Sequence, residues 1–125
     1  MRTALSSIRD RLDRAGIVLS GLCAVHCILG VLLVGALGLG GEAFLSPAIH
    51  RVGLVVALVV GLVSLGYGVL RHRRVGPLAI GGVGLALMAG AIAVGHGLPE
   101  AVLTVMGVSL VALAHIRNLH GHALR

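Results

Sequence analysis

The sequence predicts an all-α membrane protein, a bundle of four transmembrane helices with a short interfacial helix before the first span. The chain of 125 residues is 58% hydrophobic and only 11% charged, whereas about a quarter of the residues in a soluble domain are charged. Its apolar residues form four long runs, each close to the roughly 20 residues that cross a bilayer. Four spans in a chain of this length leave no room for a separate soluble domain.

The first run follows a charged segment. Residues 1–14 are expected to form a cytoplasmic interfacial helix, with Leu5, Ile8 and Leu12 on one face and the charged side chains on the other. A solvated, orienting tail is an equally good interpretation of this segment. The charged side chains are Arg9, Asp10, Arg11, Asp13 and Arg14.

The membrane domain is expected at residues 15–118, with spans at about 16–40, 50–70, 75–96 and 99–116, and a cytoplasmic tail at 119–125. The first run is too long for the apolar core of a secretory signal, about 7–15 residues, so we expect the chain to retain it. Ser46-Pro47 and Pro99 favour helix starts. The 20 glycines indicate closely packed helices but no particular pairing.

The basic residues indicate the orientation of the spans. All ten are arginines, and only Arg51 lies on the outer side of the predicted spans. The inner side carries Arg2, Arg9, Arg11, Arg14, Arg71, Arg73, Arg74, Arg117 and Arg125. This asymmetry predicts that both termini are cytoplasmic. With one Tyr, one Phe and no Trp to stack on bases, the charge favours contact with anionic lipid headgroups and argues against nucleic acid.

The stretch "SGLCAVHCILG" places Cys23, His26 and Cys27 inside the first apolar run. On a helix Cys23 faces both His26 and Cys27, whereas His26 and Cys27 diverge from each other, so Cys23 is the expected hub. The Cβ atoms of residues four apart lie about 5–6 Å from each other, too far for an undistorted disulfide. A span beginning near Gly16 would put the cysteines about 10 and 16 Å deep, in the inner half and middle of the bilayer.

Two thiols and an imidazole are typical ligands for Cu(I), Zn(II) and Hg(II), and are unsuited to magnesium or calcium. The sequence therefore predicts a soft metal site at Cys23, Cys27 and His26. The alternative interpretation is that the cysteines only fill space and that His26 hydrogen-bonds a neighbouring helix.

Further histidines are auxiliary candidates. His50 and His96 fall at the outer ends of the second and third spans, where they could receive an ion. His115 lies near the inner end of the fourth span with Asn118 on the same face, and His120 and His122 follow. These inner residues could take an ion as it leaves, or simply form a cationic cytoplasmic end.

Two stretches, "SGLCAVHCILGVLL" and "EAVLTVMGVSLVALAHIRN", resemble the MerC-domain family of small four-span inner-membrane proteins, and the resemblance runs from about Arg11 to Asn118. It implies uptake of mercuric ion into the bacterial cytoplasm, with Cys23 and Cys27 as the membrane ligands and a cytoplasmic reductase as the acceptor. Family members from mercury-resistance operons have a second cysteine pair in the tail, where this chain has His120 and His122.

We therefore expect a transporter or binding protein for a soft, thiophilic metal ion, most readily mercuric ion, moved inward by ligand exchange at the cysteine pair. No hydrolase, kinase or nucleotide motif occurs, so an enzyme is not expected, nor a permanently bound cofactor. Zn(II) and Cu(I) are alternative cargoes. The alternative functions are haem ligation through His26 and a second histidine, or redox sensing by a subunit without transport activity. The sequence leaves open a cytoplasmic metal acceptor and a homo-oligomer.

Overall fold

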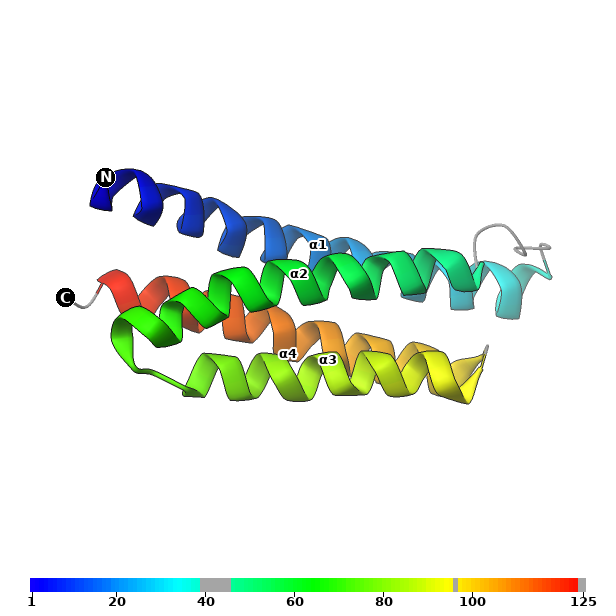
Figure 1. The fold of residues 1–125 in the computed structure, drawn as a ribbon. Coiled ribbons are helices and arrows are strands. Elements are labelled where there is room, and N and C mark those ends of the chain that lie inside the picture. The colour runs from blue at the N-terminus through cyan, green and yellow to red at the C-terminus, as the bar shows by residue number, and fades with distance from the viewer. Residues whose placement is uncertain (39–45, 96, 124–125) are drawn as a thin grey trace.

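Four helices form an up-and-down bundle in the computed structural model, which describes residues 1–38, 46–95 and 97–123 (Figure 1). They are α1 (Arg2–Leu37), α2 (Pro47–His72), α3 (Gly76–Val94) and α4 (Leu98–Ala123). Each is long and apolar enough to cross a membrane, and the described residues include no strand. The predicted all-α, four-span fold is confirmed.

The helices pack in chain order, and α4 returns to pack against α1. Both chain termini and the α2–α3 turn lie at one end of the bundle, which we call the terminal end (Figure 1). Leu37, Pro47, Val94 and Leu98 lie at the other, the distal end. Any site between the helices is therefore close to one of these two ends or in the apolar middle.

Helix boundaries follow local chemistry. Helix α1 stops at Leu37, before the expected residue 40, because Gly38 adopts a left-handed conformation (φ 59°) and its N–H donates to the Leu33 carbonyl. Pro47 begins α2 directly after Ser46, as predicted. Helices α2 and α4 run beyond the expected residues 70 and 116, so the polar ends of these helices also belong to the bundle.

The N-terminal segment differs from its expectation. Helix α1 is continuous from Arg2, so the predicted interfacial helix is its first turns. Within the bundle Arg9 and Asp13 are 2% and 0% exposed, whereas Ile8 is 54% exposed, so part of the charged face of this segment packs against the other helices. The reason is that α4 continues past its apolar run and offers polar partners to Asp13. The division into residues 1–14, 15–118 and 119–125 stays a prediction.

The buried face of α1 contains no large apolar side chain. Its residues recur at alternating spacings of four and three, one per turn, and Cys23 is half-buried while the others are buried. We call this row the α1 seam; it consists of Arg9, Asp13, Gly16, Ser20, Cys23, Cys27 and Gly30. Around its middle the bundle is apolar, with Ala57, Met88, Val108 and Val111 in the core. The two groups of interacting polar side chains thus lie toward the two ends of the seam, with Ser20 and Cys23 between them.

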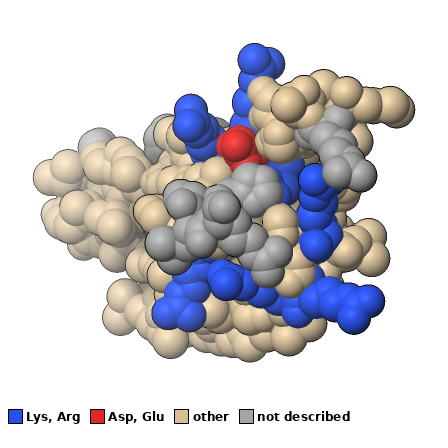
Figure 2. Space-filling model, turned by 90° about the vertical axis from the view of Figure 1, so that its left-hand side faces the viewer, with Lys and Arg blue, Asp and Glu red and all other residues tan. Residues whose placement is uncertain are grey.

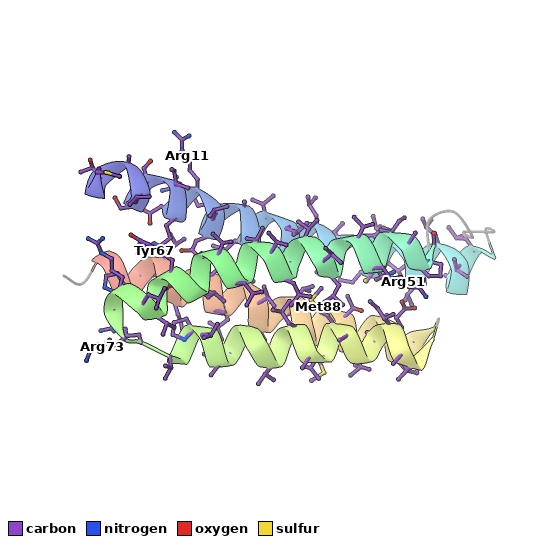
Figure 3. All side chains as sticks on the ribbon, in the orientation of Figure 1. Arg11, Arg51, Tyr67, Arg73 and Met88 are labelled. Atoms are coloured by element: carbon purple, nitrogen blue, oxygen red, sulfur yellow. The ribbon has the colours of Figure 1, made fainter. Side chains whose placement is uncertain are left out.

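Arginine side chains gather around the terminal end, as the end-on view in Figure 2 shows. Figure 3 places Arg11 and Arg73 at this end and Arg51 at the distal end. The arginines are thus concentrated at one end of the bundle, and this is the asymmetry that predicts the orientation of the spans in the membrane. The placement of the termini in the cytoplasm stays a prediction.

Helices α3 and α4 approach each other most closely at two glycines. A Cβ built on Gly84 would lie 2.6 Å from the Gly107 carbonyl oxygen, and one built on Gly107 would lie 2.6 Å from the Gly84 oxygen. Backbone is therefore in contact with backbone, which only a residue without a side chain allows.

We expect Gly84→Ala to destabilise the bundle by about 1–3 kcal/mol, because the methyl group must push the two backbones apart. Gly82→Ala on the same helix is the matched control, since no atom lies within 4 Å of its Cβ position. Unfolding in mixed detergent, followed by far-ultraviolet circular dichroism, measures the difference. Equal stability of the two variants would contradict the close approach.

Candidate metal centre

Three metal-ligating side chains meet near the distal end of the bundle. One ligand atom each from His26, Cys27 and His50 lies within 4.8 Å of the other two. The Cys27 Sγ is 3.5 Å from the His50 Nε2, and the His26 and His50 ring centroids are 5.7 Å apart with the rings tilted by 47°. We call these residues the distal centre. They supply one sulfur and two imidazole ligands, a donor set suited to transition metals.

The positions of Cys27 and His50 on their helices explain why these side chains lie close together. Cys27 is on the α1 seam, and His50 is in the first turn of α2, close after Pro47. His26 and Cys27 do diverge around α1, as expected, but the imidazole of His50 is close to both.

Two polar residues of α4, Glu100 and Thr104, lie beside the ligands His50 and Cys27. The Glu100 Oε1 is 3.6 Å from the His50 Nδ1, and both side chains are nearly buried. The Nδ1 atom makes no hydrogen bond within normal limits. The buried Thr104 hydroxyl interacts with the Cys27 thiol but forms no hydrogen bond of normal geometry. Two buried polar atoms of this region, the His50 Nδ1 and the Thr104 hydroxyl oxygen, thus lack a hydrogen bond of normal geometry.

Two cavities reach the distal centre. One of about 260 Å³ is lined by Cys27, His50 and Glu100 together with apolar and glycine residues of α1 and α4. A second of about 190 Å³ is lined by Arg51, Ile92 and Gly95, and again by His50 and Glu100. Both cavities have room for water-sized molecules and have His50 and Glu100 on their walls, so the ligand atoms border open space near the distal end.

Cys23 lies outside this group. Its Sγ is 3.9 Å from the Cβ position of Gly53, and its side chain packs against the apolar core. It also lines a groove between α1 and α2 together with His26. The expectation that Cys23 is the hub thus differs from the arrangement seen, although the part that Cys23, His26 and Cys27 play in metal binding stays a prediction.

The position along the bundle also differs from expectation. The distal centre is beside the first turns of α2 and α4, so it is near the distal end and not in the half nearer the termini. Helix α1 extends from Arg2 to Leu37, and the depth of the cysteines in the bilayer stays a prediction.

A second polar group is buried at the terminal end and joins three helices. Asp13 of α1 accepts hydrogen bonds from Ser64 of α2 and, at 2.8 Å, from the Asn118 Nδ2 of α4. The His115 Nδ1 of α4 is 2.7 Å from the Asp13 Oδ1. The Arg9 Nε is 4.0 Å from the other carboxylate oxygen. We call Asp13, Ser64, His115 and Asn118 the Asp13 cluster.

Two glycines make room for the Asp13 cluster. A Cβ on Gly16 would collide with the His115 ring, and a Cβ on Gly68 would collide with the Asn118 side-chain oxygen. Both side chains therefore rest directly against the backbone of a neighbouring helix.

The structure places the auxiliary ligand candidates in different surroundings. His50 joins the distal centre, and His115 and Asn118 share a face near the terminal end, as predicted. Their nitrogens face the Asp13 carboxylate, and their part in metal binding stays a prediction. His120 is exposed, with its Nδ1 2.9 Å from the Ile116 carbonyl oxygen. His96 and the side chain of His122 fall outside the described residues.

Sequence reasoning missed Asp13, Ser64, Glu100 and Thr104. The spacing of small and polar residues along the α1 seam was the available signal for Asp13, since it continues the face of Cys23 and Cys27. The other three are single polar residues in or beside apolar runs, with no pattern of their own.

A family model described as MerC mercury resistance protein matches residues 13–120. No curated protein and no solved structure matches the chain.

Proposed function

Because the chain belongs to the MerC mercury resistance family, we propose that it carries a soft metal ion, most readily mercuric ion, across the bacterial inner membrane by ligand exchange at Cys27 and Cys23. The observation that carries this proposal is the position of Cys27. Its thiol is buried, adjoins two imidazoles and lines a cavity near the distal end. Ionisable groups at membrane depth commonly mark a pathway.

Transfer begins when the ion enters the cavity and bonds to the Cys27 sulfur, which releases its proton. The imidazoles of His26 and His50 complete the coordination from either side. Cys23 follows one turn along the same face of α1 and is the next sulfur toward the terminal end. Its thiol bonds to the ion and loses a proton as a Cys27 or histidine bond breaks. The ion thus stays coordinated in the apolar middle, where a bare charge would be prohibitively costly.

The concentration of arginines at the terminal end orients the protein in the membrane and gives the proposed direction of transport. With the arginine-rich terminal end in the cytoplasm, the distal centre faces the periplasm and the movement is inward. The arginine side chains around that end contact anionic lipid headgroups. A cytoplasmic thiol protein or reductase then removes the ion, because His120 and His122 of the tail are weak partners for so soft a cation.

Uptake of radiolabelled mercuric ion into proteoliposomes tests the proposal. We expect the parent protein to take up the ion faster than empty vesicles do. Cys27→Ser should lower the initial rate at least about 10–100-fold, the loss that follows even when only an outer-shell partner of a metal is changed. Ser109→Ala is the control, because Ser109 is an exposed serine that bonds only its own helix.

Parent vesicles that take up mercuric ion no faster than empty ones would refute the transport proposal. The same preparation separates the alternative functions. A Soret band in its absorption spectrum would indicate haem ligation. Metal binding that survives replacement of both cysteines by serine would favour a redox-sensing subunit.

A further inference from the structure

We propose that the distal centre binds a divalent cation of intermediate softness, such as Zn²⁺, through His26, Cys27 and His50. In this proposal Glu100 is the positioning residue of His50. This inference rests on the proposed function for the use of the site, and it adds a second class of cation to the mercuric ion proposed as cargo. Five features of the centre support it: ligand spacing, the state of the His50 ring, the Thr104 hydroxyl, the identity of the donors and the charge balance.

Ligand spacing fits a tetrahedral ion. With zinc–sulfur and zinc–nitrogen bonds of about 2.3 and 2.0–2.1 Å, tetrahedral angles place the two ligand atoms about 3.5 Å apart. The Cys27 Sγ and His50 Nε2 are 3.5 Å apart. The His26 nitrogen lies within 4.8 Å of both, so it needs to move by only about 1 Å to reach the spacing of such an ion. The third ligand is thus almost in place before the ion arrives.

The two nitrogens of His50 face opposite ways. Nε2 faces the Cys27 sulfur, while Nδ1 is 3.6 Å from the Glu100 carboxylate oxygen and lacks a hydrogen bond. A metal-bound histidine usually donates its other N–H to a carboxylate, which fixes the ring and its tautomer. A small shift of Glu100 makes this bond and leaves the Nε2 lone pair directed at the ion.

Thr104 gives a second sign that the site is built for a bound ion. Its hydroxyl is buried, interacts with Cys27 and forms no hydrogen bond of normal geometry. When the Cys27 thiol becomes a thiolate, its sulfur is a stronger acceptor and the Thr104 hydroxyl can donate to it. The unpaired Nδ1 and the unpaired hydroxyl are both satisfied in the loaded centre.

The donor set favours a borderline metal over a very soft one. Two imidazoles and one thiolate suit zinc and its neighbours, whereas the softest ions favour thiolate alone. The second thiol, Cys23, is half-buried against the apolar core beside Gly53 and lies outside the group. A water from the cavity lined by Cys27, His50 and Glu100 supplies the fourth ligand.

Charge balance agrees with a divalent ion. The Cys27 thiolate and the Glu100 carboxylate together carry two negative charges, so a bound divalent cation makes the centre neutral in a region of low dielectric. Binding converts the Cys27 thiol and the free ion into a metal–thiolate bond and one proton, which leaves through the cavity. About one proton is therefore expected per ion.

The test measures Zn²⁺ binding by titration calorimetry and Co²⁺ binding by absorption, with the full-length protein in detergent. The parent is expected to bind one ion per chain and to show the visible bands of four-coordinate Co²⁺ together with a thiolate-to-cobalt band. Cys27→Ser should abolish the thiolate band, and His50→Gln should weaken Zn²⁺ binding at least 100-fold. His120→Gln, which removes an exposed histidine, is the matched control and should bind as the parent does.

Glu100→Gln tests the positioning role. It should weaken Zn²⁺ binding about 10–100-fold and shift the visible Co²⁺ bands while the thiolate band and the helical circular dichroism remain. An unchanged Co²⁺ spectrum with unchanged affinity would overturn the part assigned to Glu100.

Cys23→Ser separates this centre from a cysteine-pair site. We expect it to weaken Zn²⁺ binding at least tenfold less than Cys27→Ser does. Equal losses in the two variants, or binding of Hg²⁺ without Zn²⁺ or Co²⁺, would overturn the inference and leave the transport proposal intact. Zn²⁺ binding by a protein that takes up no metal into vesicles would instead refute transport and leave the centre intact.

Discussion

Asp13→Leu is expected to destabilise the bundle by about 2–4 kcal/mol, the largest loss of stability that we predict for a single substitution. The carboxylate accepts hydrogen bonds from Ser64 and Asn118 and contacts the His115 ring, which ties α1 to α2 and α4. Leucine is larger than aspartate and accepts no hydrogen bond, so Ser64, His115 and Asn118 lose their shared partner together and Arg9 keeps only Asp10 and His72. Removing one partner of a buried polar network costs more than the network contributes in net terms.

Asp10→Leu is the matched control for Asp13→Leu. Asp10 is in the same helix and also pairs with Arg9, but its side chain is 40% exposed, so its loss should cost less than about 1 kcal/mol. Detergent unfolding followed by circular dichroism gives both values. Equal costs for the two substitutions would mean that the Asp13 cluster does not hold the helices together.

Gly16→Ala is expected to cost about 3 kcal/mol, because the added methyl group collides with the His115 ring. The ring cannot swing away without breaking its contact with Asp13, so the substitution combines overpacking with loss of the polar cluster. Gly68→Ala should act in the same direction through Asn118.

Each of these glycines has a control on its own helix. No atom lies within 4 Å of the Cβ positions of Gly21 on α1 and Gly66 on α2, so alanine there should be neutral or slightly stabilising, since it favours the helix. The measurement is the difference in unfolding free energy within each pair. If Gly16→Ala is no less stable than Gly21→Ala, the contact between α1 and the His115 ring is wrong.

The fold was predictable because long apolar runs directly identify membrane spans. Charges between the runs and the prolines at 47, 77 and 99 limit where the helices begin. The sequence could not show how far each helix continues beyond its apolar run, because a charged residue next to a span is compatible with a tail or with a buried network. Asp13 is the example: whether it is solvated depends on His115 and Asn118, which lie 102 and 105 positions later in the chain.

The candidate site was predictable only in part. Cys23, His26 and Cys27 stood out because they are ligating residues within an apolar run, but helical spacing relates only residues on one helix. It could not show that His50, on another helix, approaches Cys27 and not Cys23. The relative rotation and height of α1 and α2 decide this, and no residue pattern in a glycine-rich sequence determines them.

The α1 seam separates its two polar groups by a fixed length of helix. Asp13 and Cys27 are 14 positions apart in the sequence, about 21 Å along the axis, with an apolar core between them. At that distance two unit charges interact by less than about 1 kcal/mol, and Arg9 offsets the charge of Asp13. A metal ion bound at the distal centre therefore has little direct electrostatic effect on the Asp13 cluster. In double variants with one substitution at each end, the changes in the free energy of unfolding should be additive. Substitutions at the distal centre can therefore change which metal binds without weakening the Asp13 cluster, which joins the helices.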